Sequence, residues 1–392
     1  MGYIREKDDA YVAATYRRFP VEVASGKGSL LYDIDGRRYI DMGSGIGVTA
    51  FGHADEAWIS AVTAQLSSVA HTSNLYYTEP CARLAELLCT RTGMKRVFFG
   101  NSGAEANECA IKVARKYAAD RYGADRHVIV TLEKSFHGRT LTTLAATGQE
   151  QFHKLFLPLT EGFVHVPPND IEAMREVLAT GKVAGVLLET VQGEGGVLPL
   201  DGDYLRAVEA LCREQDVLFM VDEVQTGNGR TGYLYSYMAF GLTPDVVSTA
   251  KGLGGGLPIG ACLLGERVFE VLGYGDHGST FGGNPTAAAG AVSILSRIDE
   301  DFLADVRRKS EVIFTTLAEK PGIVSVSGLG LMVGIETVRP AAEVVADCMA
   351  EGVLCLTAKH KVRLLPALNI DDAVLCEALE VLLAAAAKGA NE

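Results

Sequence analysis

The chain has 392 residues, of which 48% are hydrophobic and 22% are charged, an ordinary composition for a globular protein with two or three domains. Its formal net charge of −13 argues against nucleic acid or an anionic membrane surface as a partner. No apolar run approaches the ~18 residues of a membrane span, so the composition also argues against a membrane-embedded protein.

The N-terminal segment, residues 1–47, begins with the polar and acidic sequence M-G-Y-I-R-E-K-D-D-A. This sequence is unlike a secretory or organellar presequence, so we expect a cytoplasmic protein. Further along, the run L-L-Y-D-I-D-G-R-R-Y-I-D predicts a β-hairpin that turns at Asp35 and Gly36.

Short β-rich runs alternate with helical patterns between residues 95 and 265. The two clearest helical patterns, 104–117 and 203–215, repeat apolar residues at spacings of three and four. The predicted strands are R-V-F-F (96–99), H-V-I-V-T-L (127–132), V-A-G-V-L-L-E (183–189), V-L-F-M-V-D (217–222), D-V-V-S-T-A (245–250) and I-G-A-C-L-L (259–264). Near-continuous apolar strands separated by helices predict an α/β fold with a mostly parallel sheet that helices cover on both faces. We assign this large domain to residues 48–284.

The last part of the chain, residues 285–392, predicts a smaller α+β domain. Its expected elements are a helical stretch after Pro285, a strand pattern at 323–336, a helix at 341–351, a strand pattern at 362–368 and a closing helix at 371–388.

Four polar residues, Asn101, Glu189, Asp222 and Lys251, fall at the ends of predicted strands, where parallel sheets bind their ligands. Lys251 ends an apolar run and opens the glycine-rich stretch K-G-L-G-G-G-L-P-I-G-A. A desolvated lysine is a nucleophile toward an aldehyde, and a buried aspartate can pair with a ring nitrogen. Pyridoxal phosphate requires both groups. The alternative is a surface lysine beside a flexible turn.

The segment N-S-G-A-E-A-N-E, residues 101–108, joins a predicted strand to a helix. The free N–H groups at the start of that helix suit a phosphate. The alternative is a plain capping box, in which Ser102 caps the helix and Glu105 bonds back to the chain. The residues alone do not separate the two interpretations.

Three loops carry further candidate residues. F-H-G-R-T offers Phe136 to stack on an aromatic cofactor and Arg139 to bind a carboxylate, or it is an ordinary loop. Q-G-E-G-G-V offers Glu194 as the partner of an arginine, or as a solvated carboxylate. H-G-S-T-F-G-G-N-P offers Ser279 or Thr280 to a phosphate, and it also suits an interdomain hinge.

Two other kinds of site are not expected. Q-T-G-N-G-R-T-G contains G-x-G-x-x-G, but D-E-V-Q separates it from its strand and no acid follows at the ~20-residue spacing of a dinucleotide fingerprint. The eight cysteines include no C-x-x-C pair, and several lie in apolar or helical patterns, which favours reduced core thiols. No histidine has a partner at metal-ligand spacing, so we expect no metal.

Taken in chain order, these motifs resemble the class III pyridoxal-phosphate-dependent aminotransferases of fold type I. The matching segments are T-S-N-L-Y-Y-T-E-P, N-S-G-A-E-A-N-E, F-H-G-R-T, Q-G-E-G-G-V, D-E-V-Q-T-G, A-K-G-L-G-G-G-L-P-I-G-A, G-S-T-F-G-G-N-P and V-R-L-L-P-A-L. The resemblance implies pyridoxal phosphate as the cofactor and a homodimer with shared active sites.

The resemblance also implies roles for individual residues. Lys251 would hold the cofactor aldehyde and move a proton, and Asp222 would keep the ring nitrogen protonated. The other cofactor contacts would be Ser102, Gly103, Ala104, Phe136, Glu223, Val224, Gln225 and, from the neighbouring subunit, Thr280. The substrate contacts would be Arg139, Glu194, Ser279, Arg363 and Tyr77.

The reaction implied by the resemblance moves the terminal amino group of N2-acetyl-L-ornithine to 2-oxoglutarate, giving N-acetyl-L-glutamate 5-semialdehyde and L-glutamate in arginine biosynthesis. Arg139 would hold the donor's distant carboxylate and Arg363 the keto acid's carboxylate. Glu194 would cover Arg363 while the donor is bound. Other amine donors stay open, namely succinylornithine, N-succinyl-diaminopimelate, ornithine and 4-aminobutyrate. An aminomutase is a more distant alternative.

Overall fold

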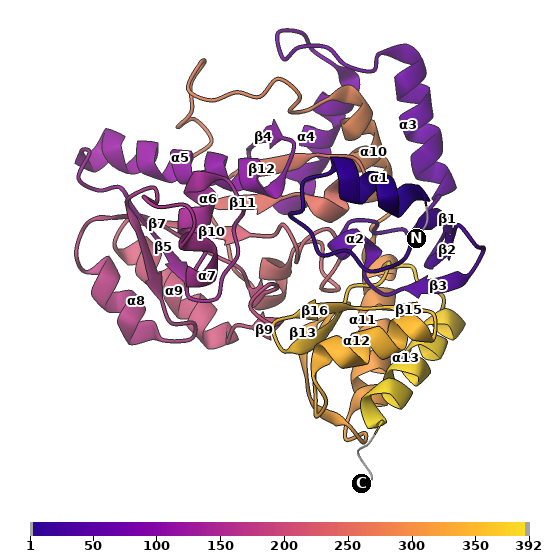
Figure 1. The fold of residues 1–392 in the computed structure, drawn as a ribbon. Coiled ribbons are helices and arrows are strands. Elements are labelled where there is room, and N and C mark those ends of the chain that lie inside the picture. The colour runs from indigo at the N-terminus through magenta and orange to yellow at the C-terminus, as the bar shows by residue number, and fades with distance from the viewer. Residues whose placement is uncertain (1–2, 389–392) are drawn as a thin grey trace.

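The computed structural model describes residues 3–388, so the first two residues of the predicted N-terminal segment and the last four of the predicted C-terminal domain lie outside it. Within this range, a central sheet of seven strands has the order β4-β12-β11-β10-β7-β5-β6 (Figure 1). The strands are β4 (Arg96–Gly100), β5 (Val128–Leu132), β6 (Phe163–Val166), β7 (Val183–Leu188), β10 (Leu218–Asp222), β11 (Val246–Thr249) and β12 (Gly260–Leu264). Neighbouring strands are parallel except at β12, which runs antiparallel to β11 and to β4. The predicted mostly parallel α/β sheet is therefore confirmed.

Strand β6 is the member of this sheet that the sequence analysis did not predict. It lies at the sheet edge beside β5, and three of its four residues are only partly buried. Its sequence F-V-H-V is short and carries a histidine in the middle of the apolar residues, so it gives a weak strand signal.

Both faces of the central sheet are covered, which explains why its strands are apolar at nearly every position. In β10, Leu218 and Met220 join the core cluster that includes α5 (Gly103–Tyr122), while Phe219 and Val221 join a second cluster. Alternate residues of a strand point to opposite faces, so the two clusters are the two sides of the sheet. Helix α5 packs against β7, β11 and β12.

The C-terminal part forms a second, antiparallel sheet in the order β13-β14-β17-β16, with helices packed beside it (gold and yellow in Figure 1). Its elements are α11 (Glu300–Leu317), β13 (Ile323–Leu329), β14 (Met332–Thr337), α12 (Ala341–Ala350), β16 (Leu356–Ala358), β17 (Lys361–Leu364) and α13 (Asp372–Ala387). This arrangement matches the predicted smaller α+β unit.

The N-terminal strands β1 (Val23–Lys27), β2 (Leu30–Asp33) and β3 (Arg38–Asp41) form an antiparallel sheet. The predicted hairpin turn is present between β2 and β3, with Gly36 in the left-handed region at φ 81°. Strand β3 also pairs in parallel with β15 (Val353–Leu354) of the C-terminal part. The N-terminal hairpin therefore shares a sheet with β15, a strand from near the C-terminal end of the chain.

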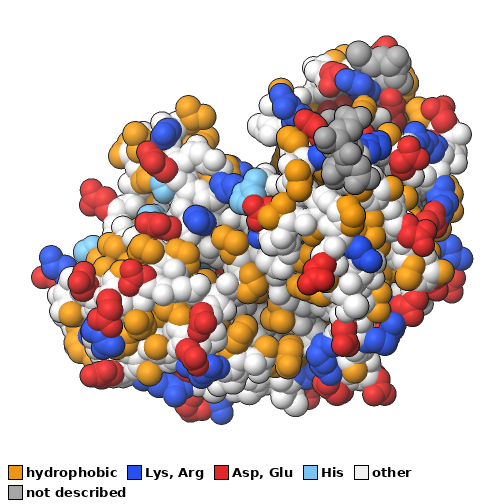
Figure 2. Space-filling view, turned by 90° about the horizontal axis from the view of Figure 1, so that it is seen from below, with side chains coloured by type: hydrophobic (Ala, Val, Ile, Leu, Met, Phe, Trp, Pro, Cys, Tyr) orange, Lys and Arg blue, Asp and Glu red, His pale blue; other side chains and the backbone are white. Residues whose placement is uncertain are grey.

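The remaining described elements are helices and short strands around these sheets. They are α1 (Tyr3–Tyr11), α2 (Ser44–Gly47), α3 (Glu56–Ser68), α4 (Glu79–Thr92), α6 (Leu141–Ala146), α7 (Glu150–His153), α8 (Ile171–Leu178), β8 (Val191–Gln192), β9 (Leu198–Pro199), α9 (Gly202–Glu214), η1 (Ser236–Phe240), η2 (Lys251–Leu253) and α10 (Pro285–Leu295). None of the helices in the described range combines the length and the apolar character that crossing a membrane requires. Acidic and basic side chains are interspersed on the face drawn in Figure 2.

Candidate active site

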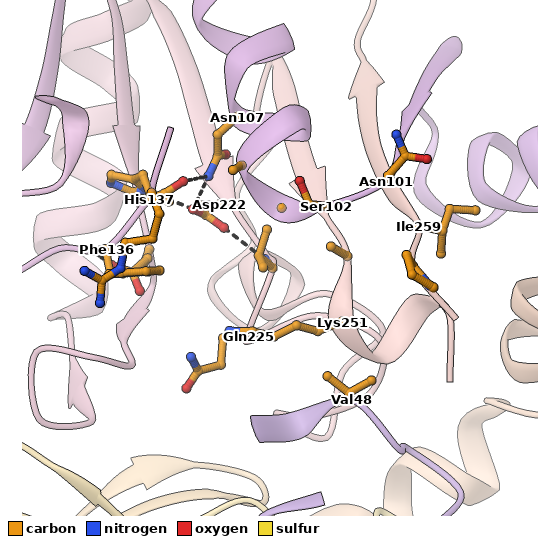
Figure 3. A pocket seen from close by; sticks show the side chains of 18 of the residues that line it. Val48, Asn101, Ser102, Asn107, Phe136, His137, Asp222, Gln225, Lys251 and Ile259 are labelled. Carbon is orange, nitrogen blue, oxygen red and sulfur yellow. Dashed lines mark hydrogen bonds and ion pairs between the residues drawn. The ribbon is translucent and has the colours of Figure 1, made fainter. Parts of the chain in front are cut away.

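A cavity of ≈ 420 Å³ lies at the carboxyl end of the central sheet. Its walls come from the ends of β4, β10 and β11, from the start of α5 and from the loop that follows β5 (Figure 3). Sequence reasoning predicts a ligand site at this edge of a parallel sheet. Of the predicted residues, the cavity is lined by Ser102, Gly103, Ala104, Phe136, Arg139, Asp222, Val224, Gln225 and Lys251.

Lys251 follows β11 and begins the short helix η2. Its backbone is left-handed, at φ 44°, a conformation that a lysine rarely adopts. Burial, the largest cause, lowers the pKa of the Lys251 ammonium below its ordinary value. Nearby Glu194 opposes this effect, while Arg363 adds to it. The site thus favours the neutral, nucleophilic amine.

Asp222 is the last residue of β10 and pairs in register with Ser248 of the neighbouring strand β11. The Asp222 Oδ1 atom accepts a hydrogen bond from the backbone N–H of Val224 at 2.9 Å. Its Oδ2 atom contacts Asn107 Nδ2 at 2.7 Å and His137 Nδ1 at 2.8 Å. These contacts hold the carboxylate in one orientation in the cavity wall (Figure 3).

Asn107 and His137 are the residues that sequence reasoning missed around Asp222. The Asn107 amide also donates to the carbonyl of His137 at 2.8 Å, and its oxygen accepts from the Ser248 hydroxyl at 2.6 Å. Asn107 lies four residues after Gly103 on α5, and His137 directly follows Phe136. Helical spacing and adjacency to a predicted contact were the available signals.

The start of α5 has the predicted capping box and leaves room for the phosphate interpretation. The Ser102 hydroxyl accepts a hydrogen bond from the Glu105 N–H at 3.2 Å, and the Glu105 carboxylate accepts one from the Asn101 N–H at 2.7 Å, which is a capping arrangement. The first N–H groups of a helix have no acceptor within it, so those of Gly103 and Ala104 remain available to an anion in the cavity.

Gly103 packs closely against Val224. A methyl group on Gly103 would lie 2.6 Å from Val224 Cγ1, which is closer than carbon atoms approach one another. The glycine therefore allows α5 to begin directly against the segment that follows Asp222.

The loop after β5 carries Phe136 and Arg139 at the cavity. The Arg139 guanidinium lies 5.4 Å from the centroid of the Phe136 ring and 4.0 Å from that of Phe152. These rings hold the guanidinium at the exposed mouth of the cavity, in a position to meet a substrate carboxylate.

Glu189 is a further residue whose contacts the sequence did not reveal. Its carboxylate accepts hydrogen bonds from the N–H of Phe136 at 3.0 Å and from the N–H of Gly193 at 3.2 Å. Burial, reinforced by the charge of Asp222, raises the pKa of Glu189 to about 7, although His137 acts in the opposite direction. Glu189 thus joins the Phe136 loop to the loop that leads to Glu194.

Glu194 and Arg363 form an ion pair beside the cavity. Arg363 Nη1 lies 2.5 Å from Glu194 Oε1 and 3.4 Å from Gln225 Oε1. Gln225 Nε2 also donates to the same Glu194 oxygen at 3.5 Å. Burial disfavours the charged form of Glu194, yet Arg363 and nearby Lys251 keep its pKa below the ordinary value. Gln225 therefore connects the cavity wall to this pair.

Six of the predicted site residues do not line the cavity, and two of them are the paired Glu194 and Arg363. The Glu223 carboxylate faces the other way and accepts hydrogen bonds from Thr226, Ser236 and Tyr237. Ser279 lies beside the cavity, where its hydroxyl accepts a hydrogen bond from Asn101 Nδ2 at 3.1 Å. Thr280 and Tyr77 are exposed to solvent.

The Glu223 side chain points away from the cavity that Asp222 faces. Asp222 ends a strand and Glu223 follows it directly, so the two side chains point to opposite sides of the sheet. Because Asp222 points to the cavity, Glu223 points away from it. Any contact of Glu223 with a cofactor would have to come from its backbone.

Residues 11–386 match the sequence profile of the family described as Aminotransferase class-III. A Haemophilus ducreyi protein named acetylornithine aminotransferase is 52% identical over 97% of both chains. A protein of the same name from Caldanaerobacter subterraneus subsp. tengcongensis is 44% identical over 95% of this chain and 96% of that one.

Solved structures show the same similarity in three dimensions. N-acetylornithine aminotransferase from Stenotrophomonas maltophilia is 36% identical, with a TM-score of 0.85 and coverage of 98% of both chains. Ornithine aminotransferase from Toxoplasma gondii is 31% identical, with a TM-score of 0.94 and coverage of 98% of this chain and 94% of that one. A second structure of the Toxoplasma enzyme is described with partial occupancy of PLP at its active site.

Proposed function

The chain belongs to the class III aminotransferases, and on that premise we propose that it transfers the terminal amino group of N2-acetyl-L-ornithine to 2-oxoglutarate. The products are N-acetyl-L-glutamate 5-semialdehyde and L-glutamate, which places the enzyme in arginine biosynthesis. The observation that carries the proposal is the 52% identity to an acetylornithine aminotransferase along nearly the whole of both chains. The ion pair between Arg363 and Glu194 supports it, because an enzyme that takes two different substrates into one site needs an arginine that can be covered.

The cavity fits pyridoxal phosphate, the cofactor of this family. Lys251 offers an amine whose pKa is lowered by burial. Asp222 is buried and, within residues 3–388, its hydrogen-bond partners are a backbone N–H, an amide and an imidazole rather than a lysine or arginine. Such a carboxylate can accept a proton-bearing ring nitrogen. The free N–H groups at the start of α5 suit the phosphate.

When bound, pyridoxal phosphate supplies an electron sink for the carbon that loses or gains the amino group. Lys251 would hold the cofactor through its ε-amine, and the same amine would move the proton at the reacting carbon. Asp222, oriented by Asn107 and His137, would keep the ring nitrogen protonated. Phe136, which lines the cavity, would stack on the ring and shield it from water.

Two arginines divide the substrates between them. Arg139, at the mouth, binds the carboxylate of the donor, which is far from the amine that reacts. Arg363 binds the carboxylate of 2-oxoglutarate next to the carbonyl that reacts. Glu194 neutralises Arg363 while the donor is present and releases it for the keto acid.

A panel of amine donors tests the proposed reaction directly. With 2-oxoglutarate as acceptor, kcat/KM is measured for N-acetylornithine, N-succinylornithine, N-succinyl-diaminopimelate, ornithine and 4-aminobutyrate. We expect N-acetylornithine to rank first. Ornithine is the main alternative donor, because the Toxoplasma ornithine aminotransferase structure matches this chain with a TM-score of 0.94. A higher ranking for another donor would reassign the substrate within the family, and product formation without an acceptor would indicate an aminomutase.

The enzyme is proposed to be a homodimer. Residues 75–77 and, on a second loop, Tyr274 and Phe281 expose large apolar side chains. Asn74 Nδ2 ties the two loops together by donating to the carbonyls of Ser279 and Gly282, both at 2.9 Å. An exposed apolar surface of this kind suits a partner subunit. Thr280 and Tyr77, which lie on these loops, would then reach the partner's cavity.

Mixing two inactive variants tests this shared site. Lys251→Ala and Thr280→Ala, each inactive or weak alone, should together regain about one quarter of wild-type activity. Random association makes half of the dimers mixed, and each mixed dimer has one intact site. Lys251→Ala mixed with Asp222→Ala is the matched control and should regain nothing, because both residues belong to the same cavity. Absence of recovery in the first mixture, with mixed dimers present, would place Thr280 in its own subunit's site.

A cytoplasmic location is also part of the proposal. All eight cysteines are free thiols, and five of them are buried. Reduced thiols in the core are typical of proteins that fold in a reducing compartment. Detection of the activity in a cytoplasmic fraction of the source cells checks this location.

A further inference from the structure

Arg230 is a buried cation that forms no ion pair with a carboxylate among residues 3–388. It is 2% exposed, and its guanidinium donates to carbonyl and hydroxyl oxygens within the described residues. Burial lowers the pKa of Arg230 to about 9, so it remains charged at neutral pH. A buried charge without a counter-ion is costly, and the contacts of Arg230 therefore point to a specific task.

A single nitrogen of Arg230 joins two neighbouring strands of the C-terminal sheet. Its Nη1 atom donates to the carbonyl of Leu331 at 3.1 Å and to that of Pro366 at 2.6 Å. Leu331 directly precedes β14, and Pro366 lies just after β17. In the ladder between these strands Gly334 pairs with Arg363, and the same register places Leu331 opposite Pro366.

The backbone of Arg230 makes a second contact with the same region. The N–H of Leu331 donates to the Arg230 carbonyl at 2.9 Å. Gly330, at φ +60°, allows this approach, because a Cβ atom there would lie 2.4 Å from the carbonyl carbon of Thr231. Side chain and backbone together fix the turn between β13 and β14 against the large domain.

We propose that Arg230 is a positioning residue for Arg363 and thereby for the amino acceptor. By holding the ends of β14 and β17, it fixes the strand that carries the Arg363 guanidinium, three residues before Pro366 and roughly 10 Å away along an extended strand. The inference rests on the proposed use of Arg363 for the carboxylate of 2-oxoglutarate. Arg139, which serves the donor, belongs to a loop that Arg230 does not touch.

The two half-reactions separate this role from a merely structural one. In Arg230→Met, the rate constant for the reaction of the aminated enzyme with 2-oxoglutarate should fall about tenfold or more, because small displacements of a binding group are costly. The reaction of the cofactor-loaded enzyme with N-acetylornithine should stay within about threefold of wild type. Arg230→Lys keeps the charge and a single donating nitrogen, so its loss should be intermediate. It replaces the methionine variant if that variant does not fold.

Arg91→Met is the matched control. Arg91 also bridges two backbone carbonyls, those of Leu295 and Ile298, but these lie at the end of α10 rather than on the strand that carries Arg363. The Arg91→Met variant should have a lower melting temperature, and its two half-reactions should slow to the same extent.

Four outcomes overturn the inference or its premise. Equal losses in both half-reactions of Arg230→Met, or the same selective loss in Arg91→Met, would show that Arg230 serves stability alone. A normal acceptor half-reaction in Arg363→Met would refute the role of Arg363 instead. Failure of the wild-type enzyme to use N-acetylornithine would refute the proposed function and not the positioning.

Discussion

The Nδ1 atom of the His137 imidazole lies 2.8 Å from Oδ2 of Asp222, and neither side chain is more than 4% exposed. Asn107 donates to the same oxygen, so Asp222 is held by two neutral or weakly basic groups rather than by a fixed cation. Replacing His137 by Ala leaves a buried carboxylate with one partner fewer, at a cost of about 1–3 kcal/mol. We expect kcat to fall roughly tenfold or more. His137→Asn, which keeps a donor, should lose less, and a kcat within twofold of wild type in His137→Ala would show that Asn107 suffices.

Lys251→Ala should abolish the covalent attachment of the cofactor. The purified variant should lose the visible absorbance of the lysine-bound cofactor while keeping the far-ultraviolet circular dichroism of the folded protein. After borohydride reduction, mass spectrometry should find the adduct on Lys251 in the wild type. Lys134→Ala, at an exposed loop lysine, is the control and should keep both signals. An adduct on any other lysine contradicts the assignment.

Gly103→Ala should weaken cofactor binding. The new methyl group would lie 2.6 Å from Val224 Cγ1 and would push the start of α5 away from the segment after Asp222. The measurement is the dissociation constant of the cofactor, obtained by titrating apoenzyme, and we expect an increase of roughly tenfold. The double variant Gly103→Ala/Val224→Ala should regain most of the affinity, because the clash is removed. A double variant as weak as the single one would locate the defect elsewhere.

Glu194→Ala uncovers Arg363 at all times. Donors that carry a carboxylate beside the reacting amine, such as glutamate, should then gain over N-acetylornithine, and the ratio of their kcat/KM values should shift by about tenfold or more. Turnover of 2-oxoglutarate should change less, because its carboxylate meets Arg363 in either enzyme. Equal losses with donor and acceptor would be incompatible with a switch.

Glu189 makes the stability of the enzyme depend on pH. Its pKa rises from 4.5 to about 7 on folding, so the folded state binds the proton more tightly than the unfolded chain. The resulting stabilisation is complete below pH 4.5 and is lost as the pH rises through 7. Glu189→Gln has no such dependence. As the pH rises from 5 to 8, the wild type should lose on the order of 2 kcal/mol of unfolding free energy relative to Glu189→Gln. Urea denaturation of both proteins measures this difference. A constant difference across this range would mean that Glu189 titrates alike in both states.

Most of the central sheet was predictable because its inner parallel strands β5, β7, β10 and β11 are buried on both faces, which leaves continuous apolar runs. The ends of those runs also located Asp222 and Lys251, since parallel strands end at a common edge. The contacts of His137, Asn107 and Glu189 were not predictable, because they depend on how helix α5 and two separate loops approach one another. Glu223 shows another limit: a motif names a stretch of residues, but alternation along the strand decides which of them faces the cavity.

The pairing of β3 with β15 was also beyond sequence reasoning. Strand β15 has two residues, Val353 and Leu354, and its partner β3 belongs to the opposite end of the chain. No local periodicity reports a contact between such distant segments. The contacts of the Arg230 Nη1 atom could not be predicted either. Their acceptors are the backbone carbonyls of Leu331 and Pro366, and every residue type has a backbone carbonyl.

The same pairing governs the order in which the molecule is completed during synthesis. Strand β3 also contacts helix α13: Arg38 Nη1 donates to Glu377 Oε1 at 2.8 Å, although the two residues are 339 positions apart in the chain. At the translation rate of about 5–20 residues per second, the N-terminal hairpin waits tens of seconds after leaving the ribosome before its partner exists. In that interval its outer strand edge is an open template for other nascent chains. Chaperone demand should therefore fall when the order of the segments is changed by circular permutation to bring β3 and β15 together.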